Sequence, residues 1–408
     1  MIRWPWSKAT PELRKLREPI QRHLGVDLVE AHSIAHEIKA IQRVNLQRVL
    51  DRWTAAANPP VQAFGFSSAG YLGDEGLVKY LITDELIQAP LERTQLDSGP
   101  EETLDCVLRG LFLFHRDKVP VMVAFRPPRY PGEVPVMEVI ASTREAASGT
   151  LSAMLDEAQE TSVYKGRTLS LEQSVDAWRA GVSIRFHEIR PTRREDIVLP
   201  DELIRLIERN VLGMLRHAEA LRAAGRSVRR GLLFHGPPGT GKTLVIRYLT
   251  QASPDHTIIL LNAAQQGLIR EACQIARMLA PSIVVLEDVD LVAEEREQNR
   301  CPVTLHELMN EMDGLAPREE VTFLLTTNRP EILEPALCAR PGRIDQAIAF
   351  PLPDDGCRRR LFEVYGRGLD LSAVDLARWV GQTNGVSPAF IEELLRKAAL
   401  LAAERGET

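Results

Sequence analysis

One short segment constrains the fold of this chain more than any other. Residues 236–243 read G-P-P-G-T-G-K-T and fit the pattern G-x-x-x-x-G-K-[ST]. An apolar run that suits a strand, 231–235, precedes the segment, and a stretch that suits a helix, 244–249, follows it. Glycines allow such a loop to turn its backbone N–H groups inward, and the following helix directs its positive end to the same point. The pattern therefore predicts a phosphate-binding loop between a strand and a helix.

The residues of this loop have different expected tasks. Lys242 would neutralise phosphate oxygens, and the hydroxyl of Thr243 would be a magnesium ligand. The other residues would surround the phosphates: Gly236, Pro237, Pro238, Gly239, Thr240, Gly241 and Leu244. The alternative, a glycine-rich turn without a ligand, is disfavoured because a strand and a helix flank the loop.

A second candidate site is the acid pair Glu287 and Asp288. It follows the apolar run 283–286, which is typical of a buried central strand. In open α/β sheets, ligands bind at the carboxyl ends of the strands. Acids after a strand are more often solvated loop residues. After a phosphate loop, however, one carboxylate is needed for the magnesium shell and another to orient and deprotonate the attacking water.

A third cluster follows a further apolar strand, 321–325. It consists of the segments T-T-N-R-P at 326–330 and R-P-G-R-I-D at 340–345. Together with the phosphate loop and the acid pair, which correspond to Walker A and Walker B, these segments resemble the AAA ATPases across about residues 195–405. The resemblance implies an α/β fold of the P-loop NTPase type, with helices on both faces of a parallel sheet and a C-terminal helical lid. It also implies ATP and Mg²⁺ as ligands and a homo-oligomeric ring, with the hexamer as the usual form in the family.

The same resemblance implies roles for individual residues. Asn328 would hold the attacking water near the γ-phosphate, Glu287 would bind magnesium and Asp288 would polarise the water. Arg340 and Arg343 would be arginine fingers that complete the site of a neighbouring subunit, where a guanidinium stabilises the charge that develops on the transferred phosphoryl group. Without the resemblance, both arginines would be interpreted as surface residues.

Two segments outside the sheet are expected beside the nucleotide. The sequence at 385–389, G-V-S-P-A, resembles the lid segment of the family, with Pro388 in place of the usual glycine, and puts Ala389 near the ligand. Asp196-Ile197-Val198 occupies the place where the family lays backbone against adenine, so Ile197 is a candidate nucleotide contact.

The chain departs from the family at two places. Most members have Asp before Glu, whereas Glu287 precedes Asp288 here, as in the branch that contains the mitochondrial Rieske-protein translocase. Asp288 is one methylene shorter than glutamate, so slower hydrolysis is expected. The second departure is segment 262–267, which lacks the aromatic residue that grips polypeptides in threading relatives. The membrane role of the translocases is not expected here, because no N-terminal membrane anchor is visible.

The N-terminal part has a different character. Apolar residues at helical spacing between Glu12 and Trp53 predict one or two helices. Short runs rich in Val, Phe and Leu follow at 107–114, 119–125 and 134–140, and the break at 116–118 between the first two suits a hairpin turn. Helical spacing returns after Ser148. This order predicts an α+β accessory domain.

Four segments are therefore expected along the chain. They are an accessory, client-recognition domain at 1–175, a polar linker at 176–195, the large nucleotide-binding domain at 196–353 and a helical lid at 354–408. The basic residues near 185–194 are interpreted as a solvated linker rather than as a nucleic-acid site.

Composition and charge limit the cellular locations and the binding partners that we expect for this protein. The net charge of −6 gives no general attraction to nucleic acid. The five cysteines are scattered and form no C-x-x-C pair, which favours a reducing cytoplasm. No apolar stretch reaches the length that a membrane span needs, so a soluble protein without a targeting segment is expected.

Three functions are compatible with these features. The leading hypothesis is an ATPase ring that remodels or moves a protein client bound by the N-terminal domain. The alternative is an ATP-dependent assembly switch or scaffold with slow hydrolysis, favoured by the inverted acid pair and the missing aromatic residue. A nucleic-acid motor would depend on a basic patch at Arg222, Arg226, Arg229 and Arg230, which are more simply explained as solvated or subunit-contacting residues.

Overall fold

The chain folds into two compact units, and each unit consists of two separate stretches of the chain. Met1–Val163 and Glu172–Ile184 form the first unit, and Tyr164–Leu171 and Arg185–Thr408 form the second. The computed structural model describes residues 15–68, 76–128, 133–173, 182–228, 230–289, 308, 310–312, 314, 319–330, 344–372 and 374–406. No helix among these described residues is long and apolar enough to cross a membrane.

An antiparallel sheet forms the centre of the first unit. Its strand order is β1-β7-β6-β5-β2-β3, and β4 pairs with β5. The strands are β1 (His32–Glu37), β2 (Gln62–Ser68), β3 (Leu86–Ala89), β4 (Glu92–Asp97), β5 (Thr103–Arg116), β6 (Val119–Arg126) and β7 (Val136–Ala141). The helices are α1 (Arg17–Leu24), α2 (Ala40–Ala55), α3 (Leu77–Ile82) and α4 (Arg144–Glu160).

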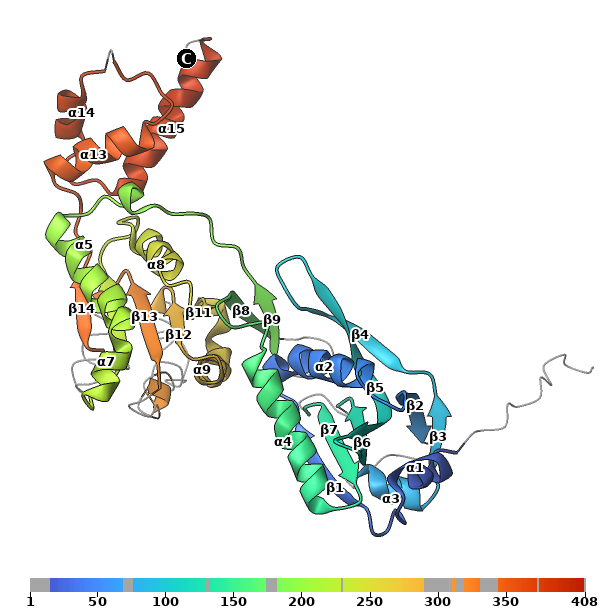
Figure 1. Cartoon of the computed structure of the whole chain (residues 1–408). Helices are drawn as coiled ribbons and strands as arrows, with labels where there is room; N and C mark the ends of the chain where they lie inside the picture. The colour runs from blue at the N-terminus through green and yellow to red at the C-terminus, as the bar shows by residue number, and fades with distance from the viewer. Residues whose placement is uncertain are drawn as a thin grey trace, which may run out of the picture. The chain divides into compact units, whose positions relative to one another are not determined.

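Alternation along the strands gives this sheet two buried faces. Successive side chains of a strand point to opposite faces. On β5, Phe112 and Phe114 belong to the cluster that packs against α2 and α4. Leu111 and Leu113 belong to the cluster that packs against α1 and α3. The first unit is therefore a sheet covered by helices on both faces (Figure 1).

The hairpin expected between β5 and β6 is confirmed. Arg116 pairs with Val119, so only Asp117 and Lys118 form the loop. Both have positive φ, 49° and 70°. Positive φ at both positions is the conformation of a two-residue type I′ turn, whose twist matches that of the strands.

Strand β1 was not predicted. The sequence indicated only helices between Glu12 and Trp53, whereas the structure has α1, then β1, then α2. The strand carries a single large apolar residue, Ile34, and is mostly exposed along its length. It lies at the edge of the sheet and pairs with β7. An edge strand of this kind has little apolar alternation, which is the signal that sequence analysis depends on.

The second unit contains a largely parallel sheet, which confirms the expected α/β class. The strand order is β14-β10-β13-β12-β11-β8-β9, and neighbouring strands from β14 to β8 pair in parallel. The end of β8, from Glu172, and the start of β9, up to Ile184, belong to the first unit. The strands are β8 (Thr168–Gln173), β9 (Val182–Phe186), β10 (Arg230–His235), β11 (Thr257–Leu261), β12 (Ser282–Leu286), β13 (Val321–Thr327) and β14 (Gln346–Ala349). Strand β8 pairs with β11, whereas the sequence predicts that residues up to 175 belong to the N-terminal domain.

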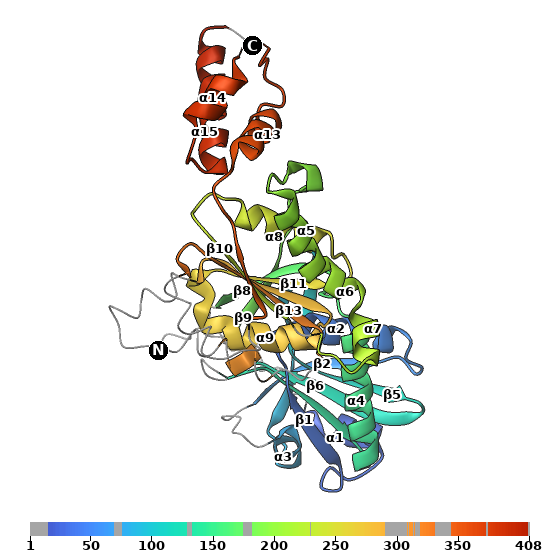
Figure 2. The same ribbon diagram turned by 90° about the vertical axis from the view of Figure 1, so that its left-hand side faces the viewer.

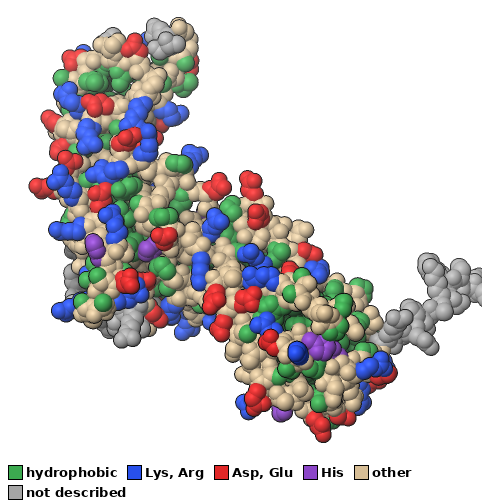
Figure 3. Space-filling model, in the orientation of Figure 1, with side chains coloured by type: hydrophobic (Ala, Val, Ile, Leu, Met, Phe, Trp, Pro, Cys, Tyr) green, Lys and Arg blue, Asp and Glu red, His purple; other side chains and the backbone are tan. Residues whose placement is uncertain are grey.

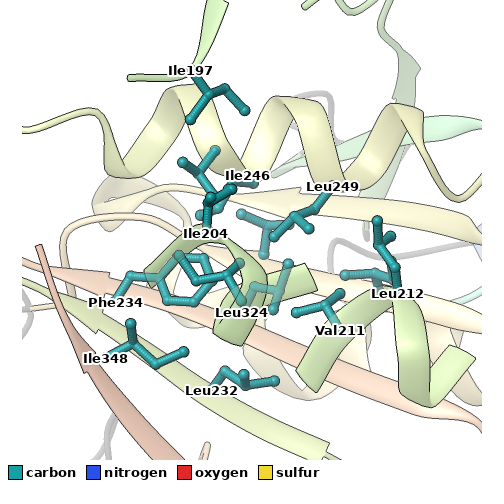
Figure 4. Packing of buried hydrophobic residues seen from close by; sticks show 14 of the residues in the cluster. Ile197, Ile204, Val211, Leu212, Leu232, Phe234, Ile246, Leu249, Leu324 and Ile348 are labelled. Carbon is teal, nitrogen blue, oxygen red and sulfur yellow. The ribbon is translucent and has the colours of Figure 1, made fainter. Parts of the chain in front are cut away.

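Helices lie on both faces of this sheet. They are α5 (Asp201–Glu208), the π-helical segment η2 (Arg209–Gly213), α6 (Met214–Arg216), α7 (Ala218–Ala223), α8 (Lys242–Gln251) and α9 (Ile269–Met278). Helices α5 and α8 share a buried cluster with strand residues such as Leu232, Phe234 and Leu324, and Ile197 lies at the edge of this cluster (Figure 4). Helix α9 contacts β11 and β12 from the opposite face (Figure 2).

The C-terminal segment is helical, as expected. It contains α13 (Asp355–Tyr365), α14 (Leu376–Gln382) and α15 (Pro388–Glu404), which share a small apolar cluster of their own. All three helices begin at capped positions: Asp354 accepts from the backbone N of Cys357, Asp375 from that of Arg378 and Ser387 from that of Phe390. Such caps satisfy N–H groups that have no partner within the helix.

The core of the second unit should depend strongly on Phe350. Its ring is fully buried and lies 5.2 Å from that of Phe234, centroid to centroid. We expect Phe350→Ala to destabilise the unit by about 3 to 5 kcal/mol, the usual cost of removing a buried ring. The control is Phe390→Ala, since Phe390 is 53% exposed and should cost less than about 0.5 kcal/mol. Denaturant unfolding measures both, and equal losses would contradict this packing.

Candidate functional site

The loop between β10 and α8 follows a path that only glycine adopts easily. Gly236, Gly239 and Gly241 have φ values of 145°, 74° and 95°. A Cβ on Gly236 would lie 2.3 Å from the carbonyl oxygen of Phe350, which is too close for any side chain. Backbone conformation therefore favours glycine at all three positions, and close packing is a second reason for glycine at Gly236 and Gly239.

This loop leads directly into the N-terminus of α8. Lys242 is the first residue of the helix and is buried. The first N–H groups of a helix have no partner within it, and the helix dipole favours negative charge there. The hydroxyl of Thr240 donates to the carbonyl oxygen of Pro237 at 2.9 Å, which ties the loop together. Loop and helix end thus form a site suited to phosphate groups.

Lys242 connects the loop to Asn328, which follows the neighbouring strand of the sheet, β13. Its Nζ donates to the carbonyl oxygens of Gly236, at 2.7 Å, and Pro237, at 3.0 Å. The same ammonium donates to Oδ1 of Asn328 at 2.8 Å. Asn328 in turn donates from Nδ2 to Oδ1 of Asp288 at 3.1 Å. A cation, an amide and a carboxylate therefore form one hydrogen-bonded line at the carboxyl edge of the sheet.

Strand order explains why these three side chains meet. β13 lies between β10 and β12, with His235 opposite Thr327 and Leu286 opposite Leu325. The residues that follow these strand ends, including Asn328, therefore emerge at one edge.

The acid pair adopts two different backbone conformations. The N–H of Glu287 donates to the carbonyl oxygen of Leu261 at 3.1 Å and so continues the pairing of β12 with β11. Asp288 has a φ of 52°, in the left-handed region where aspartate is more frequent than most residues. Its N–H donates to Oγ1 of Thr326 at 2.9 Å. Asp288, rather than Glu287, is thus the acid that contacts Asn328.

Thr326 is the first residue of the T-T-N-R-P segment, and the sequence alone predicts no role for it. Its hydroxyl accepts from Asp288 while its own strand supplies Asn328 two residues later, so one segment holds both polar groups. The only available sequence signal was a hydroxyl residue at the end of an apolar strand.

Oxygen donors that suit magnesium are present at this edge. Thr243 is exposed in the first turn of α8, and Glu287 is half-buried after β12. Hydroxyl and carboxylate oxygens are the ligands that Mg²⁺ prefers, and it commonly takes only one or two from the protein together with phosphate oxygens. The donor set therefore fits a magnesium–nucleotide complex.

The lid reaches the phosphate loop. The backbone N of Ala389 donates to the carbonyl oxygen of Gly239 at 3.2 Å. A Cβ on Gly239 would lie only 2.8 Å from that of Ala389 and 3.0 Å from Oγ of Ser387. Ile197 is buried in the core of the large domain. Of the two expected nucleotide contacts, Ala389 therefore lies against the phosphate loop. Ile197 lies in the segment just before α5.

Some expected site residues cannot be placed. Arg340 and Arg343 fall in 331–343, outside the described residues. Their roles therefore rest on the sequence motif alone.

Comparison with known proteins identifies the domain that carries this site. Residues 232–352 match the family described as "ATPase family associated with various cellular activities (AAA)". The chain is 35% identical over 224 residues to the proteasome-activating nucleotidase of Methanopyrus kandleri, covering 51% of each chain. It is 34% identical over 241 residues to the ATP-dependent zinc metalloprotease FtsH 2 of Sphaerobacter thermophilus, covering 55% of this chain and 37% of that protein. The chain thus spans about half or less of the length of these relatives.

Mutation can separate the two reasons for glycine in this loop, which are the positive φ and the lack of space for a Cβ. At Gly241 an added Cβ would meet no atom within 4 Å, so Gly241→Ala should cost only the left-handed backbone, about 1 to 2 kcal/mol. Gly236→Ala adds a collision with the backbone of Phe350 and should cost more. Midpoints of thermal unfolding compare the two variants, and an equal or reversed order would contradict the described loop.

Proposed function

The chain contains an AAA ATPase domain, and we propose that it binds ATP with Mg²⁺ and catalyses attack of water on the γ-phosphate, which releases ADP and phosphate. The observation that carries the proposal is the hydrogen-bonded line from Lys242 through Asn328 to Asp288 beside the phosphate loop. Positioning and electrostatic stabilisation supply most of the catalysis in phosphoryl transfer. A cation, a polar positioning group and a base at one edge are the groups that this chemistry needs.

Each residue has a proposed task in this reaction. The backbone N–H groups of residues 239–244 would surround the phosphates, since Pro237 and Pro238 have none to donate, and the ammonium of Lys242 would transfer its hydrogen bonds from loop carbonyls to phosphate oxygens. Thr243 and Glu287 would hold a magnesium ion, which when bound would supply positive charge to neutralise the phosphate oxygens. Asp288 accepts the proton of the attacking water, and Asn328, already bonded to Asp288, orients that water.

We further propose that the active site is shared within a homo-oligomeric ring, with a hexamer as the leading stoichiometry. The support is the R-P-G-R segment at 340–343, whose Arg340 and Arg343 would reach the nucleotide of a neighbour. An arginine supplied in this way stabilises the transition state of phosphoryl transfer. The ring would remodel or move a protein client that the first unit recognises, because the relatives include a nucleotidase named for activating the proteasome.

The cytoplasm is the proposed location. Cys106 and Cys357 are buried, free thiols. Burial raises the pKa of the Cys106 thiol to about 11. Unpaired cysteines are typical of a reducing compartment.

An assembly switch with slow hydrolysis is the second candidate. One feature favours it: Asp288, the residue proposed to polarise the water, has a side chain one methylene shorter than that of glutamate. In this case ATP binding would assemble the ring and slow hydrolysis would reset it.

A nucleic-acid motor has less support. Arg222 forms an ion pair with Glu320, and Arg230 forms one with Asp345 at 3.2 Å, so two arginines of the basic cluster face carboxylates. On the face shown in Figure 3, the basic side chains (blue) are interspersed with acidic side chains (red).

The proposal is tested by ATP turnover per subunit at increasing protein concentration. We expect turnover to rise cooperatively with concentration in the wild type. It should fall by at least about a hundredfold in Lys242→Ala and Arg343→Ala, since each variant removes transition-state charge stabilisation. Chelation of magnesium should have the same effect.

The matched control is Lys397→Ala, because Lys397 is a lid residue with a side chain 67% exposed. It should retain wild-type turnover. Turnover that survives Lys242→Ala would contradict the proposed site. Tight ATP binding without turnover at any concentration would instead favour the switch.

A further inference from the structure

A short strap, Asp196–Asp201, connects the large domain to the lid through two ion pairs. Arg367, just after α13, pairs with Asp196 at the start of the strap. Arg360, within α13, lies 3.9 Å from Asp201 at its end. Asp196 is the more protected acid, with 26% of its side chain exposed against 71% for Asp201. The pair of Asp196 with Arg367 is therefore the stronger contact of the two.

Between these ion pairs, two neighbouring side chains enter different cores. Ile197 is 2% exposed and belongs to the cluster of the large domain with Ile246 and Leu249. Val198 is 7% exposed and belongs to the lid cluster with Leu361 and Phe362. One peptide unit thus separates a residue anchored in the sheet domain from a residue anchored in the lid. The lid cannot turn away from the strap without uncovering Val198.

Asp196 is also held from the side of the large domain. The backbone N and the Nε of Arg193 donate to its Oδ2 at 3.3 and 3.2 Å. Burial by itself would raise the pKa of this carboxyl, but hydrogen bonds from Arg367 and Arg193 outweigh burial and lower the pKa below its usual value. Asp196 is therefore an anion between two arginines, and only Arg367 belongs to the lid.

The lid contacts the nucleotide-binding elements at a second point. Ala389 donates to Gly239 of the phosphate loop. The strap carries Ile197, the candidate contact for the base. The lid therefore contacts both the phosphate loop and the strap, the two segments between which the nucleotide is proposed to lie.

We propose that the ion pair of Asp196 with Arg367 is a clasp that positions the strap for nucleotide binding. Neither side chain is assigned a contact with the nucleotide, so both are positioning residues. Breaking the clasp loosens the strap and speeds nucleotide release, while Lys242, Asn328 and Asp288 keep their geometry. The inference rests on the proposed ATPase function, and the experiment has one part that needs no nucleotide.

The first part is hydrogen exchange of the nucleotide-free full chain, comparing Arg367→Gln with Arg396→Gln. Arg396 is the matched control because it is an exposed lid arginine that pairs with Glu393 within α15. We expect backbone amides of 197–199 to exchange about three- to fivefold faster in Arg367→Gln only. Arg367→Lys, which keeps the charge, should restore most of the protection. Equal exchange in Arg367→Gln and Arg396→Gln would overturn the clasp.

The second part is the ATP dependence of turnover. Arg367→Gln should raise KM about three- to fivefold and change kcat by less than about twofold, since the catalytic groups are untouched. The Asp196→Asn, Arg367→Gln double variant should lose little more than Asp196→Asn alone, because Asp196→Asn already removes the contact with Arg367. Salt raised from about 0.05 to 0.5 M should increase KM in the wild type more than in Arg367→Gln.

The outcomes separate the two proposals. Faster exchange with an unchanged KM would overturn the positioning role of the clasp. If the wild type binds no ATP while exchange still distinguishes Arg367→Gln from Arg396→Gln, the proposed function fails and the contact between strap and lid stands.

Discussion

The insertion of β13 between β10 and β12 is the constraint on which the site depends. Parallel pairing in this order brings three loops to one edge of the sheet. Lys242 and Asn328 are 86 residues apart in the chain, and Asn328 and Asp288 are 40 apart, yet each pair is hydrogen-bonded. The backbone hydrogen bonds of the sheet thus pre-organise polar groups that would otherwise have to be ordered at the cost of conformational entropy.

The lid adds a second constraint, because it contacts the site at two points. Ala389 is bonded to the phosphate loop, and the strap is anchored to α13 by charge and by Val198. Movement of the lid would therefore change both ends of the proposed nucleotide site together. Such an arrangement can connect nucleotide turnover to motion of the domains, which both the remodelling and the switch hypotheses require.

Local patterns predicted the elements better than the contacts between them. The loop at 236–243, the α/β class, the hairpin at 116–118 and the helical C-terminus could be predicted, since each depends on nearby residues. Strand β1, the pairing of β8 with β11 and the ion pair of Asp196 with Arg367 could not be, because they depend on tertiary partners. The candidate site residues were named from motifs, but the left-handed φ of Asp288 has no signal in the sequence.

The central claim is that Asp288 is the base of a nucleotide-hydrolysing site held by Asn328. The most direct measurement compares MgATP affinity and phosphate release in the wild type and in Asp288→Asn. We expect an affinity within about threefold of the wild type and a loss of turnover of about a hundredfold or more, because the amide cannot accept the proton of the attacking water. Phosphate release at the wild-type rate from Asp288→Asn would contradict the account.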